Sequence, residues 1–267
     1  MKPYDIINLI EKTAPLAAQA PWDASGVQVA SPKTAISRLA VMLDPTLPAL
    51  RQAVETGADF ILAHHPLSMK PRFPNRDDDY LAVLSLLFKH DAWLYSAHTS
   101  LDAAPGGPVR WLAQELGLAS VELLEPSDAA GPDGAQYGFG FAGLLPEPLP
   151  YPAFCRLLAQ CLGKDEWQTC GPVPERVSRV ACCPGSGGGL LPLAIAAGAD
   201  VFITGDFKYH AALDAGLAGL RVLDVGHFCL EEEMMRRFAA MLADALAVPV
   251  DFFPGRDPLA TERAPLS

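Results

Sequence analysis

Short apolar runs alternate with amphipathic segments along the first half of this chain of 267 residues. Apolar runs bounded by polar or turn residues are typical of buried strands. They predict strands at 38–43, 58–63 and 93–97. Apolar residues at helical spacing, with glycine as a stop signal, predict helices over 3–14, 47–56, 79–90 and 107–116. This alternation of strand and helix indicates a mostly parallel sheet.

The second half repeats the alternation after a segment at 125–152 that is rich in proline, glycine and aspartate. Strands are predicted at 179–183, 201–204 and 221–225, and the last long helix from about 230 to 246. Because proline and glycine favour turns, we expect the boundary between two lobes in this segment. The expected lobes are 1–124 and 125–231, with the C-terminal helix and tail, about 232–267, joining the first.

Two stretches of the chain echo each other. A Gly-Ala-Asp triplet at 57–59 precedes one apolar strand, and a second triplet at 198–200 precedes another at the same spacing. After the next helix and strand, each half carries histidine and, four residues later, a carboxylate preceded by leucine. The two pairs are His98 with Asp102 and His227 with Glu231. The matched spacing predicts two related α/β lobes.

Composition and charge limit the possible partners. The formal net charge is −11 and the pI is near 4.9, so nucleic acid is an unlikely electrostatic partner. No apolar run is long enough to span a membrane, and the N-terminus lacks a signal-peptide pattern. The six cysteines form no C-x-x-C pair, which favours a cytoplasmic chain with reduced thiols.

The strongest candidate chemistry lies where predicted strands end. His64 and His65 follow an apolar run that Pro66 terminates, and the carboxyl ends of strands are where open α/β sheets place ligands. The side chains of His227 and Glu231 can reach a common point, and so can those of His98 and Asp102. Imidazole with carboxylate suits Zn, Fe, Mn or Ni. Capping acids and core histidines are the structural alternative, which weakens because four of the six histidines stand at strand ends.

Three further residues are candidates for substrate binding or proton transfer. Gly187 belongs to a glycine-rich turn between a strand and a helix, where backbone amides can bind phosphate; a plain tight turn is the alternative. Lys208 follows another strand end and could hold an anion, or could be a solvated surface lysine. His210, like His98, could transfer protons near neutral pH.

Several motifs together resemble the family of GTP cyclohydrolase 1 type 2 homologues, also called Nif-three-like proteins. The resemblance covers nearly the whole chain and rests on the following segments: Trp22-Asp23 with Gly26-Val27-Gln28, Leu43-Asp44-Pro45-Thr46, His64-His65-Pro66-Leu67, His98-Thr99-Ser100-Leu101-Asp102, Thr204-Gly205-Asp206-Phe207-Lys208-Tyr209-His210, and Gly226-His227 with Glu231. This chain has Ser100 where the family usually has asparagine, and Pro108 onward where it usually has an Asn-Asp pair. Both departures bear on the substrate more than on the metals.

The resemblance implies two divalent metal ions, with Zn, Fe or Mn as candidates. It implies five ligands, with Glu231 as the bridge, His65 and Asp102 on one ion, and His64 and His227 on the other. His98 would orient a ligand. The implied assembly is a ring-shaped homohexamer with the metals facing an internal cavity.

These inferences together predict an α/β protein of two related lobes, whose mostly parallel sheets face a shared metal cleft. The expected function is a metal-dependent hydrolase of a nucleotide, like a type 2 GTP cyclohydrolase. A non-catalytic metal-binding or regulatory scaffold hexamer, and a nucleotide phosphoesterase that places Gly187 against phosphate, are the alternatives.

Overall fold

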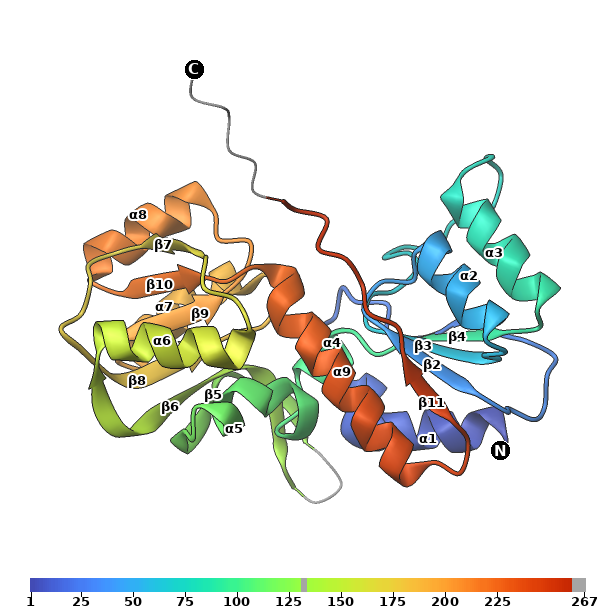
Figure 1. Cartoon of the computed structure of the whole chain (residues 1–267), viewed down its shortest axis with the longest axis horizontal. Helices are drawn as coiled ribbons and strands as arrows, with labels where there is room; N and C mark the ends of the chain where they lie inside the picture. The colour runs from blue at the N-terminus through green and yellow to red at the C-terminus, as the bar shows by residue number, and fades with distance from the viewer. Residues whose placement is uncertain (131–133, 261–267) are drawn as a thin grey trace.

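The computed structural model describes residues 1–130 and 134–260 and contains two β-sheets, each packed between helices (Figure 1). Residues 131–133 of the expected boundary segment and 261–267 of the expected tail lie outside the described residues. The mixed α/β fold with two sheets confirms the predicted fold class.

The first sheet has the strand order β1-β4-β3-β2-β11. Its core consists of parallel strands that are buried along their whole length, as expected for a sheet covered on both faces. Only β1 runs antiparallel to its neighbour. The bounds are β1 (Gly26–Val29), β2 (Leu39–Met42), β3 (Phe60–Ala63), β4 (Trp93–Ser96) and β11 (Val250–Phe252).

Helices α2 (Leu47–Glu55) and α3 (Asp79–Lys89) cover one face of this sheet, and α1 (Pro3–Thr13) covers the other (Figure 1). Both α2 and α3 begin with a side-chain cap, from Thr46 and Asp78. The predicted helix over 107–116 is in fact a 3₁₀ turn (Gly107–Arg110) followed by α5 (Trp111–Glu115). Two further short segments are a 3₁₀ turn (Leu16–Ala18) and α4 (Thr99–Asp102).

The second sheet has the order β5-β6-β8-β9-β10-β7. Strands β8 (Arg176–Cys182), β9 (Val201–Thr204) and β10 (Arg221–Asp224) are parallel, and the other pairings are antiparallel. Parallel pairing therefore dominates the first sheet but only the centre of the second. The remaining elements are β7 (Gln168–Cys170), α6 (Tyr151–Leu162), a 3₁₀ turn (Gly187–Leu190), α7 (Leu191–Ala196) and α8 (Tyr209–Ala218).

The segment 125–152, expected as the boundary between lobes, is mostly strand. It belongs to the long antiparallel pair β5 (Ala119–Ala130) and β6 (Gln136–Pro150) at the edge of the second sheet. Pro146 and Pro148 fall within β6 where its register shifts between Leu144 and Leu149, and Pro126 stands where the register of β5 begins to shift. Sheet membership changes earlier, between β4 and β5. We propose that the chain is divided into two lobes and that the boundary lies near residue 118, where the second sheet begins.

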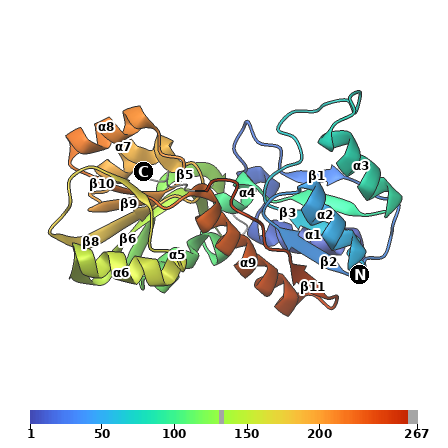
Figure 2. The same ribbon diagram turned by 45° about the horizontal axis from the view of Figure 1, so that its top comes forward.

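Helix α9 (His227–Ala245) joins the two sheets. It starts directly after β10 of the second sheet and crosses to the first, where the chain continues into β11 beside β2 (Figure 2). Its buried face, including Leu230, Met234 and Phe238, belongs to one apolar cluster that also contains inner residues of both sheets. This shared core fixes the lobes relative to each other.

The echo in the sequence corresponds to matching structure. Asp59 accepts hydrogen bonds from the backbone N–H groups of Ser37 and Arg38, at 3.0 and 3.1 Å. Asp200 accepts from the N–H groups of Ser178 and Arg179, at 2.7 and 2.8 Å and the same sequence separations. In both halves, this aspartate ties the start of one strand to the start of its parallel neighbour. Among the described residues, no helix combines the length and apolar character needed to cross a membrane.

Candidate metal centre

Three chain segments bring the predicted ligands together. His64 and His65 directly follow β3, whose carboxyl end lies at the same edge as those of β2 and β4. Asp102 ends α4, the short helix after β4. His227 is the first residue of α9 and Glu231 lies one turn later. The site therefore combines strand ends of the first lobe with the helix that arrives from the second.

Each histidine at the centre has its Nδ1 atom committed to an oxygen acceptor. His64 Nδ1 donates to the carbonyl oxygen of Ala97 at 2.7 Å. His65 Nδ1 donates to Asp44 at 2.7 Å, and His227 Nδ1 donates to Asp206 at 2.8 Å. Because carbonyl and carboxylate oxygens only accept, the proton lies on Nδ1. In a neutral ring, Nε2 then presents a lone pair.

These Nε2 atoms face the oxygens of the two buried carboxylates. Glu231 Oε2 lies 2.8 Å from His227 Nε2, 3.2 Å from His65 Nε2 and 3.7 Å from His64 Nε2. Asp102 Oδ1 lies 3.6 Å from His64 Nε2. Acceptors that face acceptors in a buried site need positive charge between them, which a bound cation supplies or, without one, a proton on the imidazole.

The orphaned atoms support this reading. His64 Nε2, Asp102 Oδ1 and Glu231 Oε2 are buried without a hydrogen-bond partner. Two nitrogen ligands on a tetrahedral zinc ion lie roughly 3.4 Å apart, comparable with the separations here. The residues therefore fit divalent cations, with imidazole and carboxylate as ligands.

Two compact groups of ligand atoms share one residue, and a third group joins His64 and His65 with His98. The first contains His64, Asp102 and Glu231, and the second contains His65, His227 and Glu231, each within 4.8 Å. Glu231 is thus the common member, as the resemblance implied. The partners differ, because the resemblance placed Asp102 with His65 and His227 with His64. This grouping depends on distances between side chains in the folded protein, which sequence spacing does not encode.

The charges of the centre are strongly perturbed in the protein without a cation. Burial opposes the charge of His65, but Asp44 and Glu231 outweigh it and raise the pKa of its imidazole to about 10. The contact with Glu231 raises the pKa of His227 to about 9, against its burial. Burial raises the pKa of Asp102, whereas the histidines hold the pKa of Glu231 well below its usual range despite burial. The site therefore attracts positive charge.

A glycine makes room for the shared carboxylate. Gly185 has φ +66°, and a Cβ atom added there would lie 2.2 Å from Glu231 Oε1. A side chain at this position would displace Glu231 and strain the backbone. The glycine-rich turn thus contributes to the candidate metal centre because its backbone can lie close to the Glu231 carboxylate.

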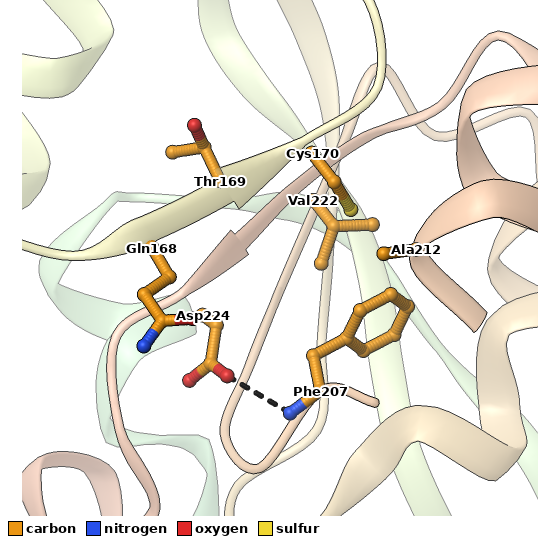
Figure 3. Close-up of a pocket in the computed structure, with 7 residues that line it drawn as sticks. All are labelled: Gln168, Thr169, Cys170, Phe207, Ala212, Val222 and Asp224. Atoms are coloured by element: carbon orange, nitrogen blue, oxygen red, sulfur yellow. Dashed lines mark hydrogen bonds between the residues drawn. The ribbon is translucent and has the colours of Figure 1, made fainter. Parts of the chain in front are cut away.

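Asp224 positions His227 through the backbone. Its carboxylate accepts from the Phe207 N–H at 2.8 Å and from the Gly226 N–H at 3.0 Å. Phe207 follows Asp206, and Gly226 precedes His227, so Asp224 ties together the two turns that carry this histidine–carboxylate pair. Figure 3 shows Asp224 and Phe207 in a small pocket of about 60 Å³ between β7, β10 and α8, which contains none of the metal-ligand candidates.

A larger pocket opens directly onto the centre. It has a volume of about 430 Å³ and lies between the lobes. Asp102, His227 and Glu231 line it together with His98 and Trp22. The pocket leaves Asp102, His227 and Glu231 open to a space large enough for a small molecule.

His98 lies at the rim of the centre. Its Nδ1 donates to Asp23 at 2.7 Å, and its ring groups with those of His64 and His65. Burial opposes ionisation of Asp23, but bonds from His98, Thr99 and Ser25 outweigh it and hold the pKa of that carboxyl well below its usual range. Unlike His227, His98 precedes its helix as the N-cap, so the echoed pairs are not equivalent.

The other three candidates receive little support from the geometry. Gly187 lines the pocket, but its N–H already donates to Thr204 Oγ1 at 3.0 Å, which leaves it unavailable for phosphate. Lys208 and His210 stand on the exposed start of α8 and do not line the pocket, because α8 turns away from the sheet edge. The prediction that they act at this site therefore lacks a geometric basis.

The sequence analysis did not predict that Asp44 and Asp206 orient two of the histidines by hydrogen bonds. Both stand directly after a strand end, and each fixes the ring of one histidine. The available signal in the sequence was a carboxylate just after each of these strands, where it can accept a hydrogen bond from a nearby histidine. The pairing could not be found without the structure, since Asp44 is 21 residues from His65 and Asp206 is 21 residues from His227.

Comparisons with known proteins agree with this fold. A "GTP cyclohydrolase 1 type 2 homolog" of Clostridium perfringens is 31% identical over 259 residues, covering 96% of this chain and 97% of its own. One of Streptomyces coelicolor is 31% identical over 242 residues, covering 89% and 84%. Reduced HcgD from Methanocaldococcus jannaschii superposes with a TM-score of 0.81 at 27% identity, covering 95% and 98%.

A Bacillus cereus protein related to NIF3 shares the fold, with a TM-score of 0.85 at 23% identity over 100% of this chain and 99% of its own. The family model described as Duf34/NIF3 (NGG1p interacting factor 3) matches residues 1–258. This match covers both sheets, helix α9 and every metal-ligand candidate. The chain therefore belongs to the Duf34/NIF3 family.

Proposed function

We propose that this chain is a hydrolase that uses two divalent cations and acts on a nucleotide. The observation that carries the proposal is the position of Glu231, which is shared by two groups of nitrogen and oxygen donors. Its Oε2 atom is buried and lacks a hydrogen-bond partner, which supports a role in which Glu231 would be shared by two cations. His64 and Asp102 would complete one site, and His65 and His227 the other.

When bound, two divalent cations would polarise a scissile bond and lower the pKa of a bound water. The protein residues orient and protect that site. Asp44 and Asp206 hold two of the imidazoles, and an outer partner of this kind typically raises the basicity of a histidine ligand. His98, held by Asp23 and lining the pocket, is the residue we propose to hold or deliver a proton at its Nε2 atom.

The names of the relatives support a nucleotide as substrate, and a GTP cyclohydrolase-like reaction is the more specific proposal. The reaction itself needs a direct test, because a fold supports many chemistries. A phosphoesterase loses its main support, since the Gly187 N–H is already engaged. A non-catalytic metal-binding scaffold is the alternative that the experiment must separate.

The experiment loads purified protein separately with Mn²⁺, Fe²⁺ or Zn²⁺ and screens nucleotides for hydrolysis products. We expect turnover that requires the metal and is lost in Glu231→Gln. Asp244→Asn, an exposed change on the same helix, is the matched control and keeps full turnover. Stoichiometric metal binding without turnover of any nucleotide would favour the scaffold.

We also propose that copies of this chain form a ring-shaped hexamer in the cytoplasm, as the family resemblance implies. Helix α8 offers an exposed apolar stripe, with Tyr209 73%, Leu213 50% and Leu217 89% exposed at intervals of four residues. Such a stripe is typical of a surface that is covered by a partner. All six cysteines are free, which is compatible with a reducing compartment.

A further inference from the structure

The pocket above the metal centre has walls contributed by both lobes. Trp22 and Ala20 come from the first lobe, while Phe139 and Leu190 come from the second. The pocket floor is formed by the candidate ligands Asp102, His227 and Glu231. A molecule bound between these walls therefore presents its reacting end to the cations.

Aromatic and apolar side chains give these walls a preference for a flat ring. Trp22 is 64% exposed although it is the largest apolar type, and it meets the His98 ring edge-on at 6.0 Å. Its indole face is therefore available to a ligand. Stacking on an aromatic side chain stabilises a bound nucleobase by about 1–3 kcal/mol and tolerates any base.

The charge of the lining disfavours phosphate. No lysine or arginine lines the pocket in the described part of the chain. Two of its three carboxylates, Asp102 and Glu231, are committed to the metal centre, which leaves Glu125. Apart from metal ions, phosphate groups are bound by cationic side chains or free backbone amides, and the Gly187 amide is engaged with Thr204.

Glu125 is placed to accept a hydrogen bond from a ligand. It stands on β5 directly opposite Phe139 of β6, so the carboxylate and the ring lie on one face of the strand pair. Within the described residues, the Glu125 carboxylate has no hydrogen bond or ion pair. A carboxylate beside an aromatic wall matches a planar ring that carries N–H donors on its edge.

We propose that this pocket binds a planar nitrogen heterocycle, with Trp22 against its face and Glu125 accepting from its N–H edge. The inference rests on the proposed function and deepens it, because it places the ring of the nucleotide at the metal centre and leaves the phosphates outside. Glu125 is then the residue that determines specificity for the ring.

The test measures binding by calorimetry, using protein loaded with Zn²⁺ and the four ribonucleosides as probes. We expect at least one nucleoside to bind, and Glu125→Gln to weaken it about tenfold, because a charged acceptor is replaced by a neutral amide. Trp22→Ala weakens the same nucleoside. Asp128→Asn, an exposed change on the same strand outside the pocket, leaves its affinity unchanged.

Inorganic tripolyphosphate distinguishes the two ends of a nucleotide. We expect it not to displace the bound nucleoside from the zinc-loaded protein. Displacement at similar concentrations, no binding of any of the four nucleosides, or equal affinities for wild type and Glu125→Gln would each overturn the inference. Ring binding that depends on Glu125 but is never followed by hydrolysis supports this inference while contradicting the proposed hydrolase.

Discussion

His227 and Glu231 lie one turn apart on α9, with the imidazole Nε2 2.8 Å from the carboxylate Oε2. The helix was expected to begin at about 230, but it begins at His227. Residues four apart on a helix share one face, so both side chains reach the same point. Asp206 and Asp224 fix the first turn of this helix in place.

The grouping of ligands predicts which pairs of substitutions act together. In His64→Ala with Asp102→Asn, both changes affect one cation, so the double variant should retain close to one metal equivalent. In His65→Ala with Asp102→Asn, the changes affect both cations, and less than one equivalent should remain. Elemental analysis after dialysis measures this difference. The reverse pattern would support the pairing implied by the family resemblance.

Asp206→Asn should weaken metal binding without unfolding the protein. The substitution removes the charged acceptor that orients His227, and loss of such an outer partner typically costs about 10–100-fold in metal affinity. Competition with a chromophoric chelator measures the affinity. Asp214→Asn, an exposed change on α8, is the control and should bind metal as the wild type does. A metal affinity of Asp206→Asn equal to that of the wild type would show that Asp206 does not position His227 for metal binding.

Gly185→Ala should disturb the metal centre through shape alone. The added methyl group would overlap with Glu231 Oε1, and φ +66° is strained for alanine. We expect a lower metal content and a lower melting temperature. Gly189→Ala is the matched control in the same turn, because a Cβ there meets nothing within 4 Å. A Gly185→Ala protein with full metal content would show that the turn simply shifts.

Asp59 should contribute to stability in a manner that depends on pH. Burial opposes its charge, but hydrogen bonds from Lys33 and Ser37 and from the backbone lower the pKa of the Asp59 carboxyl. A lowered folded-state pKa means that its contribution is complete above the unfolded pKa of about 3.9 and is lost as pH falls through the folded value.

Asp59→Asn should therefore lower the free energy of unfolding by about 1–3 kcal/mol at pH 7. The difference from wild type should shrink below about pH 4. Urea denaturation at both pH values measures it, with Asp244→Asn as a surface control. A difference between wild type and variant that is the same at both pH values would contradict a role for the ionised carboxylate.

Leu217→Glu should weaken assembly if α8 lies in an interface between copies. A charge placed at this 89% exposed position would be buried on association, and burying an unpaired charge is costly. Light scattering after gel filtration reports the mass of the assembly. Leu259→Glu, at a 76% exposed position in the C-terminal segment, is the control. An unchanged mass in Leu217→Glu would exclude α8 from the interface.

The sequence by itself determined most of the local elements and the set of ligand candidates. The apolar runs before His64 and after Asp200 became buried strands, because a strand covered on both faces needs apolar residues throughout. Parallel pairing then brought the strand ends, with their histidines, to one edge of each sheet. The echo between the halves was equally readable, since the two Gly-Ala-Asp triplets precede their strands at the same spacing. The hydrogen bonds that Asp59 and Asp200 accept, across 21 and 22 residues, were not readable.

Only the tertiary structure decided which ligand candidates lie close together and which candidates lie elsewhere. The 125–152 segment became strands because pairing with β8 overrides its turn-rich composition. Lys208 and His210 turned away with α8, and Glu125 entered the pocket from the edge of the second sheet. Side-chain direction and the docking of two lobes through α9 set these outcomes. Both depend on contacts between residues far apart in the chain, which local patterns do not encode.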